Sequence, residues 1–159
     1  MDFSLTTRDI LLFGHVGAAI VLIGPLIVAA SLFPRYITSA IDSPGEIAVA
    51  RALHRITRGY NNADIVVALL GVGLAFESDL WSEPFVTGGI GIFLVASVLI
   101  FAVILPGQAN ALRLLANGAD VPAVELATIG AVISRLRAVT GITSLLWAAL
   151  LFLMVVKPS

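Results

Sequence analysis

The chain has 159 residues, of which 59% are hydrophobic and 12% charged, with a formal net charge of −1 and no cysteine. Soluble domains carry about 25% charged and about 45–50% apolar residues, so this sequence lacks the polar surface that a water-soluble fold needs. The composition therefore excludes a soluble enzyme, a nucleic-acid-binding protein and a disordered chain. It also excludes disulfides and thiolate metal sites, and two histidines are too few for a histidine-rich metal cluster.

Four apolar segments predict an all-α polytopic membrane protein, a four-helix bundle in which residues 1–159 form one domain. A spanning helix needs about 20 mostly apolar residues, and runs of this length satisfy their backbone groups in lipid as helices. Because the N-terminus lacks a positively charged start, we expect an uncleaved first span rather than a signal peptide. The predicted spans are residues 10–33, 57–76, 85–105 and 138–156.

Prolines and capping residues predict where the helices end. Pro34 is expected to end the first helix, and Pro106 either to end or to kink the third. Residues 43–46 (SPGE) predict the start of the second helix, residues 117–118 (NG) the end of the third, and Asp120 the start of the fourth. Helices two to four would each be about 50 Å long at 1.5 Å per residue. They would therefore extend beyond a hydrocarbon core of about 30 Å, on one side of the membrane.

The distribution of basic residues predicts the orientation of the spans. The positive-inside rule places arginine-rich connections in the cytoplasm. We therefore expect a multi-pass protein of the cytoplasmic (inner) membrane with both termini outside, N-out and C-out, and with helical extensions in the cytoplasm. Seven of the nine basic residues lie in the two connections assigned to the cytoplasm: Arg35, Arg51, Arg55, Arg58, Arg113, Arg135 and Arg137.

Short motifs along the chain are similar to those of a known family. They are GHVG at 14–17, RGYNNAD at 58–64, LPGQANALR at 105–113, and SRLR at 134–137 with FLMVVKP at 152–158. Together they resemble the bacterial four-helix predicted integral membrane proteins grouped as domain of unknown function 2269. The resemblance implies a bacterial inner-membrane topology and no particular reaction. A weaker likeness, carried by a histidine early in the first span, is to haem-linked and copper-resistance membrane proteins of four to five helices.

Asp64 is the most informative polar residue, because a carboxylate inside a span costs about 2.5–3.5 kcal/mol on insertion scales. Asn61 and Asn62 lie one turn nearer the arginine-rich end. If the first two spans are antiparallel, these side chains lie near residues 21–24, where Pro25 is expected to break the first helix and free a carbonyl. One interpretation is structural, with the amides bonded to that carbonyl and Asp64 paired with an arginine or the backbone. The other is a polar pocket for a proton, a cation or a headgroup.

His15 lies inside the first span between small residues. It is predicted either to form a hydrogen bond across a close helix contact or to ligate a haem. His54 lies at the other end of the second helix, more than about 20 Å away at 1.5 Å per residue. The two histidines therefore cannot ligate one haem within a subunit. No cofactor is identified from the sequence, and haem is not favoured.

Arg51, Arg55 and Arg58 recur on one helical face and are expected to lie at the membrane surface, where they fix topology or bind anionic lipid headgroups. Trp147, near the middle of the fourth span, is expected to pack in the bundle or to wall a cavity. A small residue every fourth position at Gly130, Ser134 and Ala138 favours close packing with a neighbouring helix.

These patterns favour a non-enzymatic integral membrane protein that serves as an accessory, scaffold or assembly module. Its expected partners are membrane lipids and either further copies of itself in a homo-oligomer or the subunits of a larger membrane complex, with no nucleic acid. No catalytic triad or paired-carboxylate site is present, so no catalytic residue is assigned. The alternative is a cofactor- or ion-handling protein with a haem, quinone or proton site formed by Asn61, Asn62, Asp64 and His15.

Overall fold

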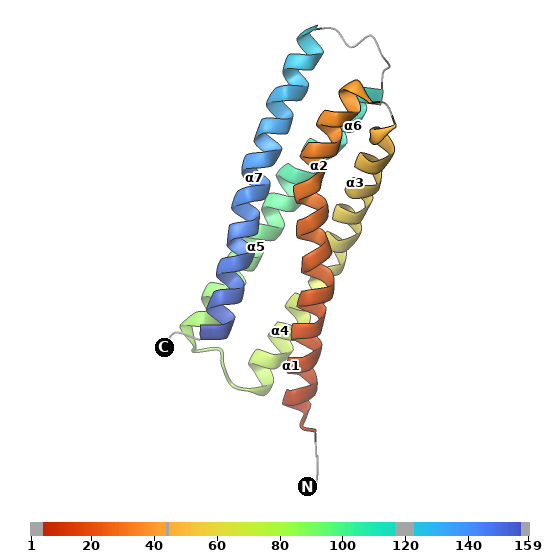
Figure 1. Cartoon of the computed structure of the whole chain (residues 1–159). Helices are drawn as coiled ribbons and strands as arrows, with labels where there is room; N and C mark the ends of the chain where they lie inside the picture. The colour runs from red at the N-terminus through yellow and green to blue at the C-terminus, as the bar shows by residue number, and fades with distance from the viewer. Residues whose placement is uncertain (1–4, 44, 117–122, 157–159) are drawn as a thin grey trace.

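The computed structural model describes residues 5–43, 45–116 and 123–156, and every element within these ranges is helical (Figure 1). In chain order the elements, with η denoting a π-helix, are α1 (Thr7–Ala18), η1 (Ala19–Ile23), α2 (Gly24–Asp42), α3 (Glu46–Ala63), α4 (Ile65–Glu77), α5 (Pro84–Leu99), η2 (Ile100–Ile104), α6 (Leu105–Ala116) and α7 (Ala123–Val156). They form four long rods. Helix I comprises α1, η1 and α2; helix II comprises α3 and α4; helix III comprises α5, η2 and α6; and helix IV is α7.

The predicted four-helix bundle is confirmed. Helices I to IV include helical segments of 36, 32, 32 and 30 residues, each with an apolar part long enough to cross a membrane. At 1.5 Å per residue these segments measure about 45–54 Å, so all four exceed a hydrocarbon core of about 30 Å. The extension expected for three helices therefore applies to helix I as well.

Helix I corrects one predicted boundary. It does not end at Pro34 but continues through it to Asp42. Pro34 is buried in the bundle, and its carbonyl accepts a hydrogen bond from Thr38 Oγ1 at 2.7 Å. A proline removes one backbone donor, but tertiary packing on both sides of Pro34 keeps the rest of the helix intact.

Two π-helices explain how helices I and III continue past Pro25 and Pro106. Pro25 does not break helix I, and Pro106 does not end helix III; each follows the end of a π-helix by two residues. Because proline cannot donate to the carbonyl four residues before it, a local change in bonding pattern lets the helix continue. The alternative in which helix III continues past Pro106 is therefore confirmed.

Helix II is interrupted at Asp64, although the sequence predicts an unbroken helix. The Val67 N–H donates to the Asp64 carbonyl at 2.9 Å, and the Ala68 N–H donates to the same carbonyl at 3.3 Å. The first bond spans three residues, so the turn at Asp64 is tighter than an α-helical turn. At the start of helix II, Gly45 is the N-cap and no side chain caps it, contrary to the SPGE prediction. Pro44, residues 117–118 and Asp120 lie outside the described residues.

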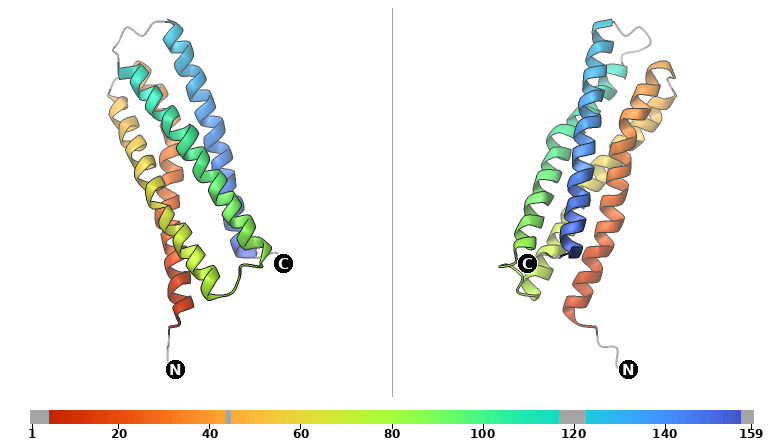
Figure 2. Two further views of the ribbon diagram at one scale, coloured as in Figure 1. Left: turned by 180° about the vertical axis from the view of Figure 1, so that it is seen from behind. Right: turned by 60° about the vertical axis from the view of Figure 1, so that its left-hand side comes forward.

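The bundle is built from two antiparallel hairpins. Within the first, α1 packs against α4 and α2 against α3; within the second, α5 and α6 pack against α7. The hairpins meet where α2 contacts α7 and α3 contacts α6, toward the end of the molecule opposite the two termini (Figure 2).

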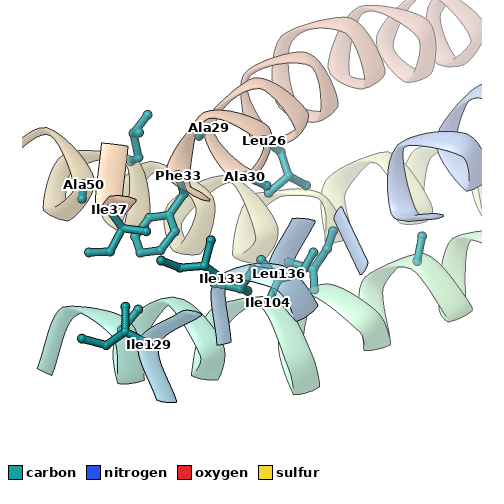
Figure 3. Packing of buried hydrophobic residues seen from close by; sticks show 14 of the residues in the cluster. Leu26, Ala29, Ala30, Phe33, Ile37, Ala50, Ile104, Ile129, Ile133 and Leu136 are labelled. Atoms are coloured by element: carbon teal, nitrogen blue, oxygen red, sulfur yellow. The ribbon is translucent and has the colours of Figure 1, made fainter. Parts of the chain in front are cut away.

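The main core lies where the hairpins meet. Buried aliphatic and aromatic side chains from all four helices interlock there (Figure 3). A second, small cluster joins Ala75, Phe85 and Val86 at the other end. Large apolar side chains elsewhere face outward, among them Phe13 at 82% and Leu145 at 72% exposure. Such a surface suits a lipid solvent. The largest fully buried apolar side chains are Leu26, Phe33, Ile37, Ile100, Ile104, Ile129 and Leu136.

Candidate functional site

The buried face of helix II is polar in its middle. Leu53, Thr57, Asn61, Asp64 and Val67 follow one another at intervals of three or four residues, which is the spacing of one helical face, and all five are buried. Three consecutive members of this face carry polar side chains. A span that buries three polar groups toward the bundle interior has the pattern of a functional site.

Asp64 is the centre of this polar face. Its side chain is 4% exposed, and its Oδ2 atom has no hydrogen-bond partner. Asn61, one turn earlier, is 9% exposed, and its Oδ1 atom also lacks a partner. None of the described arginines forms an ion pair with Asp64. The arginine pairing of the structural interpretation is therefore not seen. Asn62 is exposed and does not join the site.

The contacts between helices I and II locate the groups opposite Asp64. Gly14 lies against Leu70, and the His15 ring lies against Gly71. Continued along two antiparallel helices, this register places Asp64 opposite η1, and α3 does pack against η1. The predicted proximity of Asp64 to residues 21–24 agrees with this register. The carboxyl group thus lies beside a π-helix, a local irregularity that recurs at functional sites.

His15 lies on helix I and contacts helix II. Its Nδ1 atom lies 2.9 Å from the Val67 carbonyl oxygen. A carbonyl only accepts, so Nδ1 carries the proton and donates, and Nε2 is the basic nitrogen of the neutral ring. This geometry matches the prediction of a hydrogen bond across a close helix contact. Val67 follows Asp64 by one turn, so His15 is anchored on the same helix, beyond Asp64 in the direction of Gly71.

A second polar group, not predicted from the sequence, joins helices II and III. Gln108 is fully buried, and its Oε1 atom lies 3.0 Å from His54 Nδ1. Its Nε2 atom donates to Thr57 Oγ1 at 3.5 Å, and Thr57 Oγ1 donates to the Leu53 carbonyl at 2.9 Å. With an amide oxygen as acceptor, His54 donates from Nδ1. The chain of donors runs in one direction from His54 to the helix backbone.

The structure keeps the two histidines apart, as expected. His54 precedes Val67, the residue that binds His15, by 13 positions, which is about 20 Å along a helix. A haem held by both histidines of one chain is therefore excluded by geometry. Within the described residues, no group of three or more histidine, aspartate or glutamate side chains is placed to hold a metal ion.

Arg51, Arg55 and Arg58 are all exposed on α3, away from the buried polar face. On the opposite hairpin, one guanidinium nitrogen of Arg137 donates to Thr38 Oγ1 at 3.3 Å and links helices IV and I. The Arg137–Thr38 contact therefore joins the two hairpins.

The fold places this chain among multi-span helical membrane proteins, since four of its helices are long and apolar enough to cross a bilayer. Comparison of the chain with protein-family models, curated proteins and solved structures finds no match.

Proposed function

We propose that this chain is a proton-binding integral protein of a bacterial cytoplasmic membrane, with Asp64 as the group that takes up the proton. The observation that carries the proposal is the burial of the Asp64 carboxyl group, with one oxygen unpartnered and no ion pair to any described cationic side chain. A buried charge needs a counter-charge or hydrogen bonds, and proton binding removes the charge where neither is present.

The position of Asp64 in the helix supports this role. Arg58, which is exposed, precedes it by six residues, about 9 Å along the axis. With the arginines at the membrane surface, Asp64 lies within the hydrocarbon layer, where ionisable groups commonly mark proton pathways. His15 lies further along the same face of helix II, where its ring contacts Gly71, seven residues after Asp64. Its Nε2 atom is the basic nitrogen of the neutral ring.

The orientation and the lipid contacts belong to the same proposal. We place the arginine-bearing ends of the helices in the cytoplasm and both termini outside, following the positive-inside rule. Exposed Arg51, Arg55 and Arg58 then face the headgroup layer of the inner leaflet, where each basic side chain near an anionic surface contributes about 1 kcal/mol of attraction.

Infrared difference spectroscopy on the purified protein in lipid tests proton binding directly. A pH step should change a carbonyl-stretch band of a protonated carboxyl group in the wild type, and Asp64→Asn should remove that band. Exposed Glu77 supplies the matched control, because Glu77→Gln should leave the band in place. If the band is absent in the wild type, or survives Asp64→Asn in a folded protein, the proposal is wrong. Proton flux in proteoliposomes then distinguishes transport from simple binding.

A second candidate function, an assembly module that forms a homo-oligomer or joins a larger complex, is favoured by one face of α7. The small residues expected to pack against a neighbouring helix point outward, so the bundle itself does not use them. Small residues at such spacing let two helices approach closely, and most of these residues lie in the part of α7 that precedes the predicted span. The exposed small residues are Ala127, Gly130, Ser134, Ala138 and Gly141.

Native mass spectrometry of detergent-solubilised protein tests the assembly function. Gly130→Leu should dissociate an oligomer formed through this face. Gly91→Leu is the control, because both glycines are exposed and neither has an atom within 4 Å of an added Cβ. A monomeric wild type in mild detergent contradicts the homo-oligomer, and a co-purifying protein lost in Gly130→Leu alone supports the larger complex.

A further inference from the structure

The middle of helix IV carries a second buried polar segment, separate from Asp64. Thr143 Oγ1 donates to the Val139 carbonyl at 2.8 Å, and Ser144 Oγ donates to the Thr140 carbonyl at 2.9 Å. These bonds use the hydroxyl protons within the helix and leave oxygen lone pairs available as acceptors.

Two further polar atoms of this segment have no partner at all. Trp147 is 4% exposed and Thr140 is 5% exposed, yet Trp147 Nε1 and Thr140 Oγ1 make no hydrogen bond. An indole nitrogen only donates, whereas a hydroxyl both donates and accepts. Phe93 packs edge-on against the Trp147 ring, with the ring centres 5.6 Å apart, and limits the orientations open to the indole. Buried donors of this kind are nearly always satisfied in proteins, commonly by ordered water.

Both side chains line the same small pocket. The pocket has a volume of about 10 Å³, counted as the space open to the centre of a water-sized sphere. Thr143 and Ser144 also line it. That space suits one water molecule and excludes a larger ligand. Its walls are otherwise apolar and include Ala30 of helix I with Ile100 and Ile104 of helix III.

The local backbone explains why space remains at this point. Ile100 and Ile104 are the first and last residues of η2, and a π-helical turn holds its side chains in an arrangement that a regular α-helix does not. Ala30 of helix I also lines the pocket, and its small methyl group leaves space there. The other apolar residues that line the pocket from helices I and III are larger: Leu26, Ile27, Ile100 and Ile104.

We propose that this pocket is a binding site for a single internal water molecule, which accepts a hydrogen bond from Trp147 Nε1 and donates one to Thr140 Oγ1. The free lone pairs of Thr143 and Ser144 serve its second proton. The water lies between helices I, III and IV, which all contribute side chains to the pocket. This site does not depend on proton binding at Asp64.

Nuclear magnetic resonance of the full-length protein in detergent tests the site. Trp81 is replaced by phenylalanine, so that the single indole N–H resonance belongs to Trp147. That resonance should show a cross-peak to water. Ala30→Leu should abolish the cross-peak by filling the pocket, and Thr140→Val should weaken it by removing one water ligand. Val28→Leu, which enlarges an exposed side chain of the same helix, should leave it unchanged.

Each outcome decides the proposal. Absence of the cross-peak from a resolved Trp147 resonance overturns it, and so does a cross-peak of equal strength in the wild type, Ala30→Leu and Thr140→Val. If Ala30→Leu fails to fold, the Thr140→Val comparison stands alone, because that substitution nearly preserves side-chain shape. Trp147 fluorescence gives a second readout, since loss of a hydrogen-bonded water should move the emission to shorter wavelength in Thr140→Val but not in Val28→Leu.

Discussion

Replacing Gly71 with alanine places a methyl group against the His15 ring. An added Cβ would lie 2.9 Å from His15 Cε1 and 3.2 Å from Nδ1. Both distances are below ordinary van der Waals contact, so the ring has to move. The ring is not free to do so, because its Nδ1 atom donates to the Val67 carbonyl at 2.9 Å. We therefore expect the substitution to weaken that hydrogen bond.

The magnitude follows from three contributions. Overpacking a well-packed site costs about 1–3 kcal/mol, and loss of an interhelical hydrogen bond in a membrane protein costs about 0.6 kcal/mol on average and at most about 1.7. Replacing a mid-helix glycine with alanine returns about 0.5–1 kcal/mol. The net expectation for Gly71→Ala is a loss of about 1–2 kcal/mol in the free energy of unfolding.

Gly73 supplies the matched control on the same helix. Its added Cβ would meet Leu11 at 3.8 Å, an ordinary contact, so Gly73→Ala should be neutral or stabilising by up to about 1 kcal/mol. Unfolding of the purified protein in mixed micelles measures both. In a His15→Ala background the penalty of Gly71→Ala should disappear. A penalty that persists without the histidine ring, or none in the wild-type background, would refute the packing of His15 on Gly71.

Four further changes have expected outcomes. Gln108→Leu leaves the His54 Nδ1–H without its acceptor and should lower the free energy of unfolding by about 1 kcal/mol. Phe33→Ala, at a fully buried position, should cost about 3–5 kcal/mol, whereas Phe101→Ala, at 69% exposure, should change stability by less than about 0.5 kcal/mol; the same unfolding assay measures all three. Neutralising the three α3 arginines to glutamine should reduce the anionic lipid retained in native mass spectrometry.

The spans were predictable because length and hydropathy alone determine whether a helix can cross a bilayer. Exact boundaries were less accessible. Pro34 is a helix breaker in isolation, yet in this chain packing on both sides carries the helix past it. The interruption at Asp64 had no signal in the sequence either, since aspartate followed by β-branched residues does not distinguish a tight turn from a regular one.

The burial of Gln108 was not predicted from the sequence because it depends on the π-helix η2. The buried face of helix III runs through Ala96, Ile100, Ile104 and Gln108. In a regular α-helix with 3.6 residues per turn, twelve residues rotate a side chain by about 120° away from its starting face. The π-helix η2 absorbs this rotation and returns Gln108 to the interior. A search at constant helical period therefore places this glutamine outside the core.

Asp64 was found because a carboxylate in an apolar span is conspicuous, and its buried position agrees with that prediction. Its lack of a partner was not predictable, because pairing depends on which face each arginine takes. Arg51, Arg55 and Arg58 occupy the exposed face of α3, whereas Asp64 continues the buried one.

In the proposed placement, the exposed arginines determine how deeply the bundle sits in the membrane. Arg58 is the arginine nearest to Asp64 on helix II, and it is exposed. Movement of the bundle by one helical turn, about 5.4 Å, would draw the Arg58 charge into the hydrocarbon layer, where a charge costs up to about 2.5–3.5 kcal/mol at full depth. Movement in the opposite direction would expose apolar side chains to water. In this placement the bundle is favoured at one depth in the membrane, and the depth of Asp64 follows from it.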